Sequence, residues 1–84
     1  MKGTEKQIKF AEDIKARLAN RVTKVYASDD ESKTVIEKAL EFIDRKYDDA
    51  AYWIETEKNR SYENDLYLEW FCEMTEDPEM QKIF

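Results

Sequence analysis

Apolar residues recur every three or four positions through most of the chain, which is the period of one face of an α-helix. The first stripe predicts a helix at about residues 4–25, which Thr4 and Gln7 begin as a capping box. Its apolar face consists of Ile8, Ala11, Ile14, Leu18, Val22 and Val25, with Lys15 at the edge. The polar segment 26–32 ends this helix, and Ser28 with Glu31 predicts a second capping box.

A second stripe runs from Val35 to Ile54 without a break in phase. Two structures fit this pattern. One is a single helix over about residues 30–58, with a kink near Asp48 tolerated; the other is a new helix that Asp48 or Asp49 caps in the same phase. Because neither Gly nor Pro interrupts the stripe, the single helix is favoured.

The last third of the chain predicts a helix from Ser61 to about Thr75 and a short terminal helix. The apolar side of the longer one carries Tyr62, Leu66, Tyr67, Trp70, Phe71 and Met74. Asp77 is placed to cap the short helix, with Pro78 at its first position. Met80, Ile83 and Phe84 are then expected to pack back onto the other helices. The prediction is an all-α fold, a three-helix bundle plus a short C-terminal helix, in a single domain over residues 1–84.

Composition agrees with a compact helical domain. The 84 residues contain one Gly and one Pro, so the chain lacks the turn residues that hairpins need. Hydrophobic residues make up 42% and eleven residues are aromatic, which is enough for one core. There is no apolar run of about 18 residues and no apolar stretch near the start of the kind that signal peptides have. With a single cysteine, Cys72, the chain is expected to be soluble and cytoplasmic, with no membrane partner.

Residue types that commonly carry catalysis or hold cofactors are scarce. The chain has no histidine, and it has no Gly-rich loop that could bind phosphate. Cys72 lies between aromatic and acidic residues, so it is expected to be a half-buried small residue rather than a reactive thiol. We therefore expect no enzymatic activity, no cofactor, no metal site and no small-molecule substrate.

Charge is unevenly distributed along the chain. The net charge is −6, yet residues 1–26 contain seven basic and three acidic residues, and residues 27–84 contain seven basic and seventeen acidic ones. The basic residues of the first helix share one side, where Asp13 is the only acid: Lys6, Lys9, Arg17, Arg21 and Lys24. Acidic side chains form two further lines. The first contains Glu37, Glu41 and Asp44, and the second contains Asp65, Glu69, Glu73 and Glu76.

These lines have three interpretations. In the simplest, they are solvated outer faces whose opposite signs favour one arrangement of the helices. In the second, carboxylates that recur every 5 to 6 Å or so along a helix imitate a row of phosphates and bind a basic groove on a protein partner. In the third, the basic side of the first helix binds nucleic acid, but the −10 of the remaining chain would repel phosphates. The second gives the leading functional hypothesis, an acidic protein-binding module. Its expected contact residues are those of the last helix, Asp65, Glu69, Glu73 and Glu76, with Glu37, Glu41 and Asp44 as a second line.

Three aromatic residues lie at or beyond the flank of the second stripe: Phe42, Tyr52 and Trp53. Trp and Tyr are typical of the residues that contribute most to interfaces, so these three are candidate anchors for a partner. They also support an alternative hypothesis, a structural homodimer that buries aromatics around Trp53 and Phe42.

Two segments of the chain resemble a known group of proteins. They are GTEKQIKFAEDIKAR, from Gly3, and DDAAYWIETEKNR, from Asp48. Together they cover about 28 residues and resemble small uncharacterised proteins of phages and mobile elements in Gram-positive bacteria. Ala51 stands at a variable position of that pattern, and the basic residue expected after Trp-Ile comes only at Lys58 or Arg60. The resemblance implies an accessory, phage-borne setting, in which small acidic helical proteins inhibit host defence nucleases such as CRISPR effectors or restriction enzymes.

Overall fold

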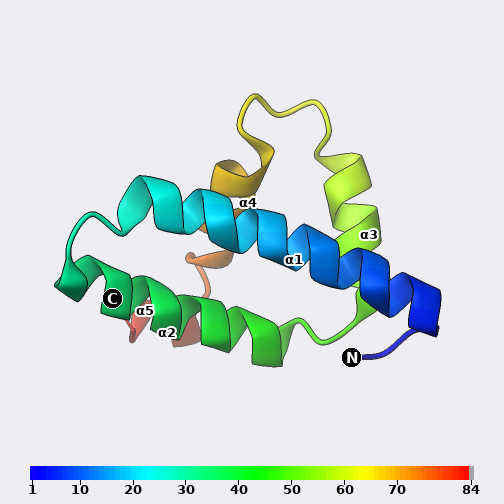
Figure 1. The fold of residues 1–84 in the computed structure, drawn as a ribbon, viewed down its shortest axis with the longest axis horizontal. Helices are drawn as coiled ribbons and strands as arrows, with labels where there is room; N and C mark the ends of the chain where they lie inside the picture. The colour runs from blue at the N-terminus through cyan, green and yellow to red at the C-terminus, as the bar shows by residue number, and fades with distance from the viewer. Residues whose placement is uncertain (84) are drawn as a thin grey trace.

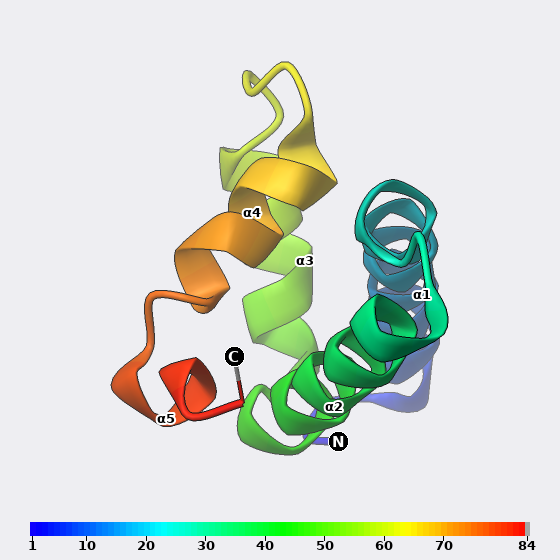
Figure 2. The same ribbon diagram turned by 90° about the vertical axis from the view of Figure 1, so that its left-hand side faces the viewer.

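The computed structural model describes residues 1–83, which form five α-helices. Helix α2 runs alongside α1, and α3 and α4 also pack against α1 (Figures 1 and 2). The elements in chain order are α1 (Glu5–Tyr26), α2 (Asp30–Lys46), α3 (Ala50–Asn59), α4 (Leu66–Met74) and α5 (Pro78–Gln81). The all-α prediction is confirmed, whereas the expected number of helices is wrong.

Helix α1 is the element around which the other helices are arranged. The Thr4 hydroxyl accepts from the Gln7 backbone N–H, and the Gln7 side chain accepts from the Thr4 N–H, so the predicted capping box is confirmed. Four residues of the predicted stripe are buried: Ala11, Ile14, Leu18 and Val22. Helix α1 contacts α2, α3 and α4. Burial of this apolar stripe stabilises α1, although most of its residues are polar.

The single helix favoured for residues 30–58 is wrong, because the chain breaks after Lys46 and Asp49 caps a new helix. The Trp53 indole N–H donates to the Tyr47 carbonyl at 2.8 Å, which satisfies a group that the end of α2 leaves free. The N-terminal segment holds the same junction, because the Lys2 N–H donates to the Asp48 carbonyl at 3.0 Å and the Ala50 N–H donates to the Lys2 carbonyl at 2.8 Å. Lys2 lies outside the 30–58 pattern, and Trp53 acts through a hydrogen bond of its side chain. The period of the apolar residues therefore carries no signal for either contact.

Two helix starts also differ from the prediction. Helix α2 is capped by Asp29, whose carboxylate accepts from the Ser32 N–H at 2.7 Å, in place of the expected pair of Ser28 and Glu31. Helix α4 begins at Leu66, because residues 60–65 form turns. Tyr62, expected on the apolar side of a helix from Ser61, therefore lies in a turn and is 81% exposed.

Aromatic side chains fill the space between α1, α3 and α4. The rings of Trp53 and Trp70 are both buried, with centroids 5.0 Å apart, and Phe71 and Met74 complete this part of the core. The C-terminal prediction is confirmed in part: Asp77 caps α5 with Pro78 at its start, Met80 is fully buried and Ile83 packs against the core. Phe84 lies outside the described residues. Among the helices of residues 1–83, none has the length and apolar composition of a membrane span.

Gly3, in the N-terminal segment, has both a backbone conformation and a close neighbour that disfavour a side chain. Its φ of +137° is disfavoured for residues with a side chain, and a Cβ added there would lie 2.9 Å from the Ala50 Cβ. The two segments that carry the resemblance, which contain Gly3 and Ala50, thus meet at this contact. The conformation and the contact together explain why glycine stands here.

We predict that Gly3→Ala lowers the free energy of unfolding by about 1 to 3 kcal/mol, because it adds both backbone strain and a steric clash. Urea unfolding followed by circular dichroism measures this change. The Gly3→Ala/Ala50→Gly double variant is the control, since removing the Ala50 methyl group relieves the clash but not the strain. A single variant as stable as the parent protein would show that the N-terminal segment does not hold the junction between α2 and α3.

Candidate partner-binding site

Half of the acidic line predicted on the last long helix is neutralised within the fold. Asp65 binds Arg21 of α1 and Glu73 binds Arg60, while Glu69 and Glu76 are exposed and form no ion pair within residues 1–83. Four carboxylates that the helical pattern places in one line therefore have different roles. Two of them stabilise contacts between elements.

The contact of Arg21 with Asp65 is a two-pronged ion pair. The Arg21 Nη2 donates to the Asp65 Oδ2 at 2.7 Å, and its Nε donates to the same oxygen at 3.2 Å. These hydrogen bonds, and then the charge of the guanidinium, lower the pKa of the Asp65 carboxyl below its usual range. Asp65 stands at the N-cap of α4 but makes no capping hydrogen bond there.

Arg60 has a comparable role at the other end of α3. Its side chain is 16% exposed, donates to the Glu63 Oε1 at 2.8 Å and also binds Glu73. The second oxygen of Glu63, Oε2, is buried without a hydrogen-bond partner in the described part of the chain. Loss of hydration, and then the nearby Glu63 carboxylate, raise the pKa of Glu69. This region is an internal electrostatic network at the turn between α3 and α4.

The basic side of α1 is partly occupied by the protein's own acids. Besides Arg21, Arg17 takes part: its Nη1 donates to the Glu57 Oε2 and to the Tyr67 hydroxyl, both at 3.3 Å. Lys6, Lys9 and Lys24 remain exposed, without an ion pair among residues 1–83. The two arginines that were candidates for phosphate binding therefore tie α1 to α3 and α4.

The acidic line of α2 is left more open than that of α4. Asp44 forms an ion pair with Lys15 of α1. Glu37 and Glu41 are exposed and have no ion-pair partner in residues 1–83. These two carboxylates lie about 6 Å apart along the helix axis, because each residue of an α-helix advances it by roughly 1.5 Å.

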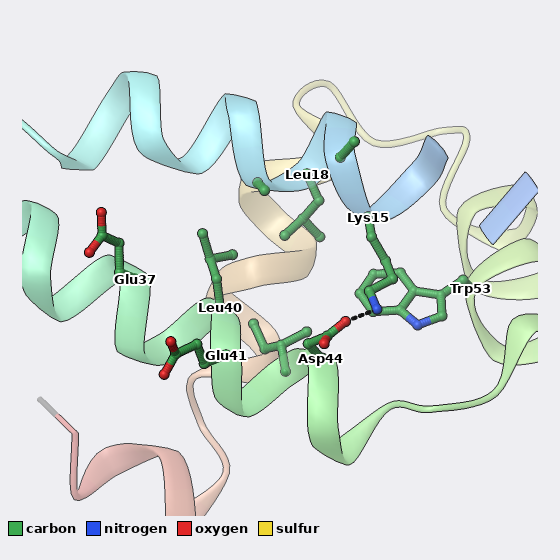
Figure 3. A pocket seen from close by; sticks show the side chains of 10 residues that line it. Lys15, Leu18, Glu37, Leu40, Glu41, Asp44 and Trp53 are labelled. Carbon is green, nitrogen blue, oxygen red and sulfur yellow. Dashed lines mark hydrogen bonds and ion pairs between the residues drawn. The ribbon is translucent and has the colours of Figure 1, made fainter. Parts of the chain in front are cut away.

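Glu37 and Glu41 border a groove of about 470 Å³ between α1 and α2, hereafter the α1/α2 groove. Figure 3 shows Leu40 pointing from α2 toward α1, with the two glutamates near one end and Trp53 near the other. The residues that line it are Lys15, Ala16, Leu18, Ala19, Glu37, Leu40, Glu41, Ile43, Asp44 and Trp53. The groove thus combines an apolar interior with an acidic edge.

Lys15 closes the groove beside Trp53. As expected for a residue at the edge of the stripe, its stem lies along the core, and its side chain is 19% exposed. The ammonium reaches Asp44 and lies 5.8 Å from the centroid of the Trp53 ring (Figure 3). Burial lowers the pKa of Lys15, which nearby carboxylates partly offset. This bridge between α1 and α2 marks one end of the groove.

The structure does not expose the three candidate aromatic anchors as a group. Trp53 is fully buried, so it is not an exposed anchor, and the homodimer hypothesis loses that surface contact. The half-buried Tyr52 ring stacks on Tyr47, and its hydroxyl accepts from the Trp70 indole N–H at 3.2 Å. Phe42 is half-buried beneath the Lys46 ammonium. Tyr52, expected outside the stripe, and Trp53, expected on its flank, both belong to the packing between α3 and α4.

Other exposed apolar side chains were not singled out from the sequence, among them Phe10 at 49%. The only signal for Phe10 was its position outside the stripe of α1. Cys72 also differs from expectation, since it is exposed, with its Sγ 3.5 Å from the Tyr26 hydroxyl. Cys72, but not Phe10, lines a second groove, of about 530 Å³, in which Glu31 is the only charged residue among the described lining residues.

Within residues 1–83, no group of three or more acidic or cysteine side chains is arranged to hold a metal ion.

The Arg21–Asp65 pair predicts a specific dependence of stability on pH. Because the pKa of Asp65 is lower in the folded state than its unfolded value of about 3.9, the ionised carboxylate stabilises the fold above that pH. This stabilisation is lost as the pH falls through the folded-state pKa. Glu69, whose pKa is raised, acts in the opposite direction.

We therefore predict that Asp65→Asn is less stable than the parent protein at pH 7 and that the difference shrinks below about pH 4. Urea unfolding measured from pH 7 to pH 3 tests this. Glu76→Gln, which removes an exposed carboxylate near the end of the same helix, is the control and should behave like the parent. A difference that stays constant over this range would contradict the assigned role of the ion pair.

Comparisons with models of protein families, with curated proteins and with solved structures found no match to this chain. Function is therefore inferred from the geometry and charge of the site.

Proposed function

We propose that this protein is a protein-binding module that presents the acidic edge of α2 to a basic surface of a protein partner. Glu37 and Glu41 are the residues that make this contact. The proposal keeps the class of function expected from the sequence but moves the contact from α4 to α2.

One observation carries the proposal: Glu37 and Glu41 are exposed and unpaired within residues 1–83, beside an apolar groove. Asp44, Asp65 and Glu73, by contrast, are already bound to cationic side chains of the same chain. A carboxylate that must give up an internal partner contributes less to binding than one that is free. The free pair on α2 is therefore the better contact for a cation.

The overall charge supports the same kind of partner. At −6, the protein attracts a basic surface over long range, which raises the association rate most at low salt. Host defence nucleases belong to the class of proteins with basic surfaces, because they bind nucleic acid. The phage setting implied by the resemblance favours such a target, in which case the protein acts as an inhibitor.

We predict that Glu37→Lys/Glu41→Lys abolishes capture of the partner, whereas Glu69→Lys/Glu76→Lys, with the same change in charge, retains most of it. The two pairs differ in whether they border the α1/α2 groove. The measurement is affinity purification with tagged protein from a nuclease-treated lysate of the source organism, quantified by mass spectrometry.

The nuclease treatment removes proteins that are bridged by nucleic acid. A protein retained by the parent and by the α4 variant but lost with the α2 variant is the expected partner, and its association should slow as salt is raised. The proposal fails if the α2 variant retains the partner and the α4 variant loses it. Equal losses would indicate a response to net charge alone and would also reject a specific site on α2.

A further inference from the structure

We propose that the α1/α2 groove binds a basic amphipathic helix of the partner, whose apolar side chains enter the groove while its Lys or Arg residues contact Glu37 and Glu41. This inference rests on the proposed function and adds the form of the bound segment. The sequence-based expectation was a line of carboxylates that imitates nucleic acid and binds by charge alone. The groove instead indicates a contact that combines charge with apolar packing.

The walls of the groove differ in a way that admits side chains from outside. On α1 the wall is formed by the small residues Ala16 and Ala19, and Ala16 is exposed. On α2 the wall is formed by Leu40, which is only partly buried although it packs against the core. Small residues on one wall leave room for a partner's apolar side chain to reach Leu40 and the apolar residues beneath it.

The carboxylates without an ion-pair partner in residues 1–83 lie at one edge of the groove. Glu37 and Glu41 are one turn apart on α2, and the only cation that lines the groove in residues 1–83, Lys15, is bound to Asp44 at the other end. A partner helix with two basic residues one turn apart matches the spacing of the two glutamates. The apolar residues of that helix at positions three or four away would then face the groove, as in other complexes that seat a helix between two helices.

The second groove fits such a segment less well. Its lining contains the apolar residues Val35, Ile36 and Phe71, but Glu31 is the only charged side chain among its described residues. It therefore offers apolar contact without a line of charge. The two neighbouring carboxylates of the α1/α2 groove, Glu37 and Glu41, are the feature that selects a basic helix.

The test uses two synthetic peptides of equal length and equal positive charge, measured by isothermal titration calorimetry. One is an amphipathic helix of leucine and lysine, and the other carries the same lysines with serine in place of leucine. We expect the leucine peptide to bind the parent protein at least about tenfold more tightly, because only it buries apolar surface in the groove.

Two kinds of variant separate the contributions of shape and charge. Ala19→Phe fills the groove without changing charge and should reduce the advantage of the leucine peptide to less than about threefold. Ala16→Phe, at a more exposed position, is a second variant that fills the groove, and thermal unfolding followed by circular dichroism confirms that each variant is folded. Glu37→Gln/Glu41→Gln should weaken both peptides to a similar extent.

The outcomes distinguish this inference from the function on which it rests. If both peptides bind equally, both groove-filling variants bind like the parent, and the Gln variant weakens both, the acidic edge is the site and the helix-in-groove proposal is wrong. If the Gln variant binds both peptides as the parent does, the proposed function itself is contradicted. Retention of the leucine advantage in folded Ala19→Phe and Ala16→Phe would place apolar binding elsewhere and would also reject the inference.

Discussion

The indole of Trp53 lies fully buried beneath α1, and its N–H donates to the carbonyl of Tyr47 at 2.8 Å. This one side chain links the three parts of the structure. It satisfies the free end of α2, it packs on Trp70 of α4 with ring centroids 5.0 Å apart, and it lines the α1/α2 groove below Lys15. A buried indole needs a partner for its N–H, and the carbonyl that it binds is the one freed where the chain turns from α2 into α3. The break between these helices and the end of the groove therefore have the same physical origin.

The distribution of charge follows from the same arrangement. Because α3 and α4 pack against α1, Arg17 and Arg21 meet Glu57 and Asp65, and part of the basic surplus of the first third of the chain holds elements together. Helix α2 also packs against α1, and within residues 1–83 Lys15 is the only residue of α1 that forms an ion pair with it. What remains is an acidic edge beside an apolar groove, which is a more specific surface than a line of negative charge. Such a surface can discriminate between a basic peptide and a basic amphipathic helix, because the second also buries apolar area.

Local signals were sufficient to predict α1, its capping box and the start of α5, since each depends on residues a few positions apart. The break before Asp49 was one of the two structures that fit the pattern, but periodicity could not select it, because the break depends on the side chain of Trp53 and the backbone of Lys2. For the site, the helical wheel correctly predicts that Glu37 and Glu41 share an exposed side of a helix. It cannot show that Asp65 forms an ion pair with Arg21, which is 44 residues away in the sequence. Nor can it show that Glu73 forms one with Arg60, which lies in the turn after α3.

The most direct test of the account is to map where a basic ligand binds. In a titration of ¹⁵N-labelled protein with the leucine and lysine peptide, followed by heteronuclear NMR, we expect the largest changes in amide shift on α2 around Glu37 and Glu41 and on α1 around Ala16 and Ala19. The indole resonance of Trp53 should shift with them, because this ring lines the same groove. The account is contradicted if the largest changes instead fall on residues 69–79, around α4 and α5, while the amides of Glu37 and Glu41 stay in place.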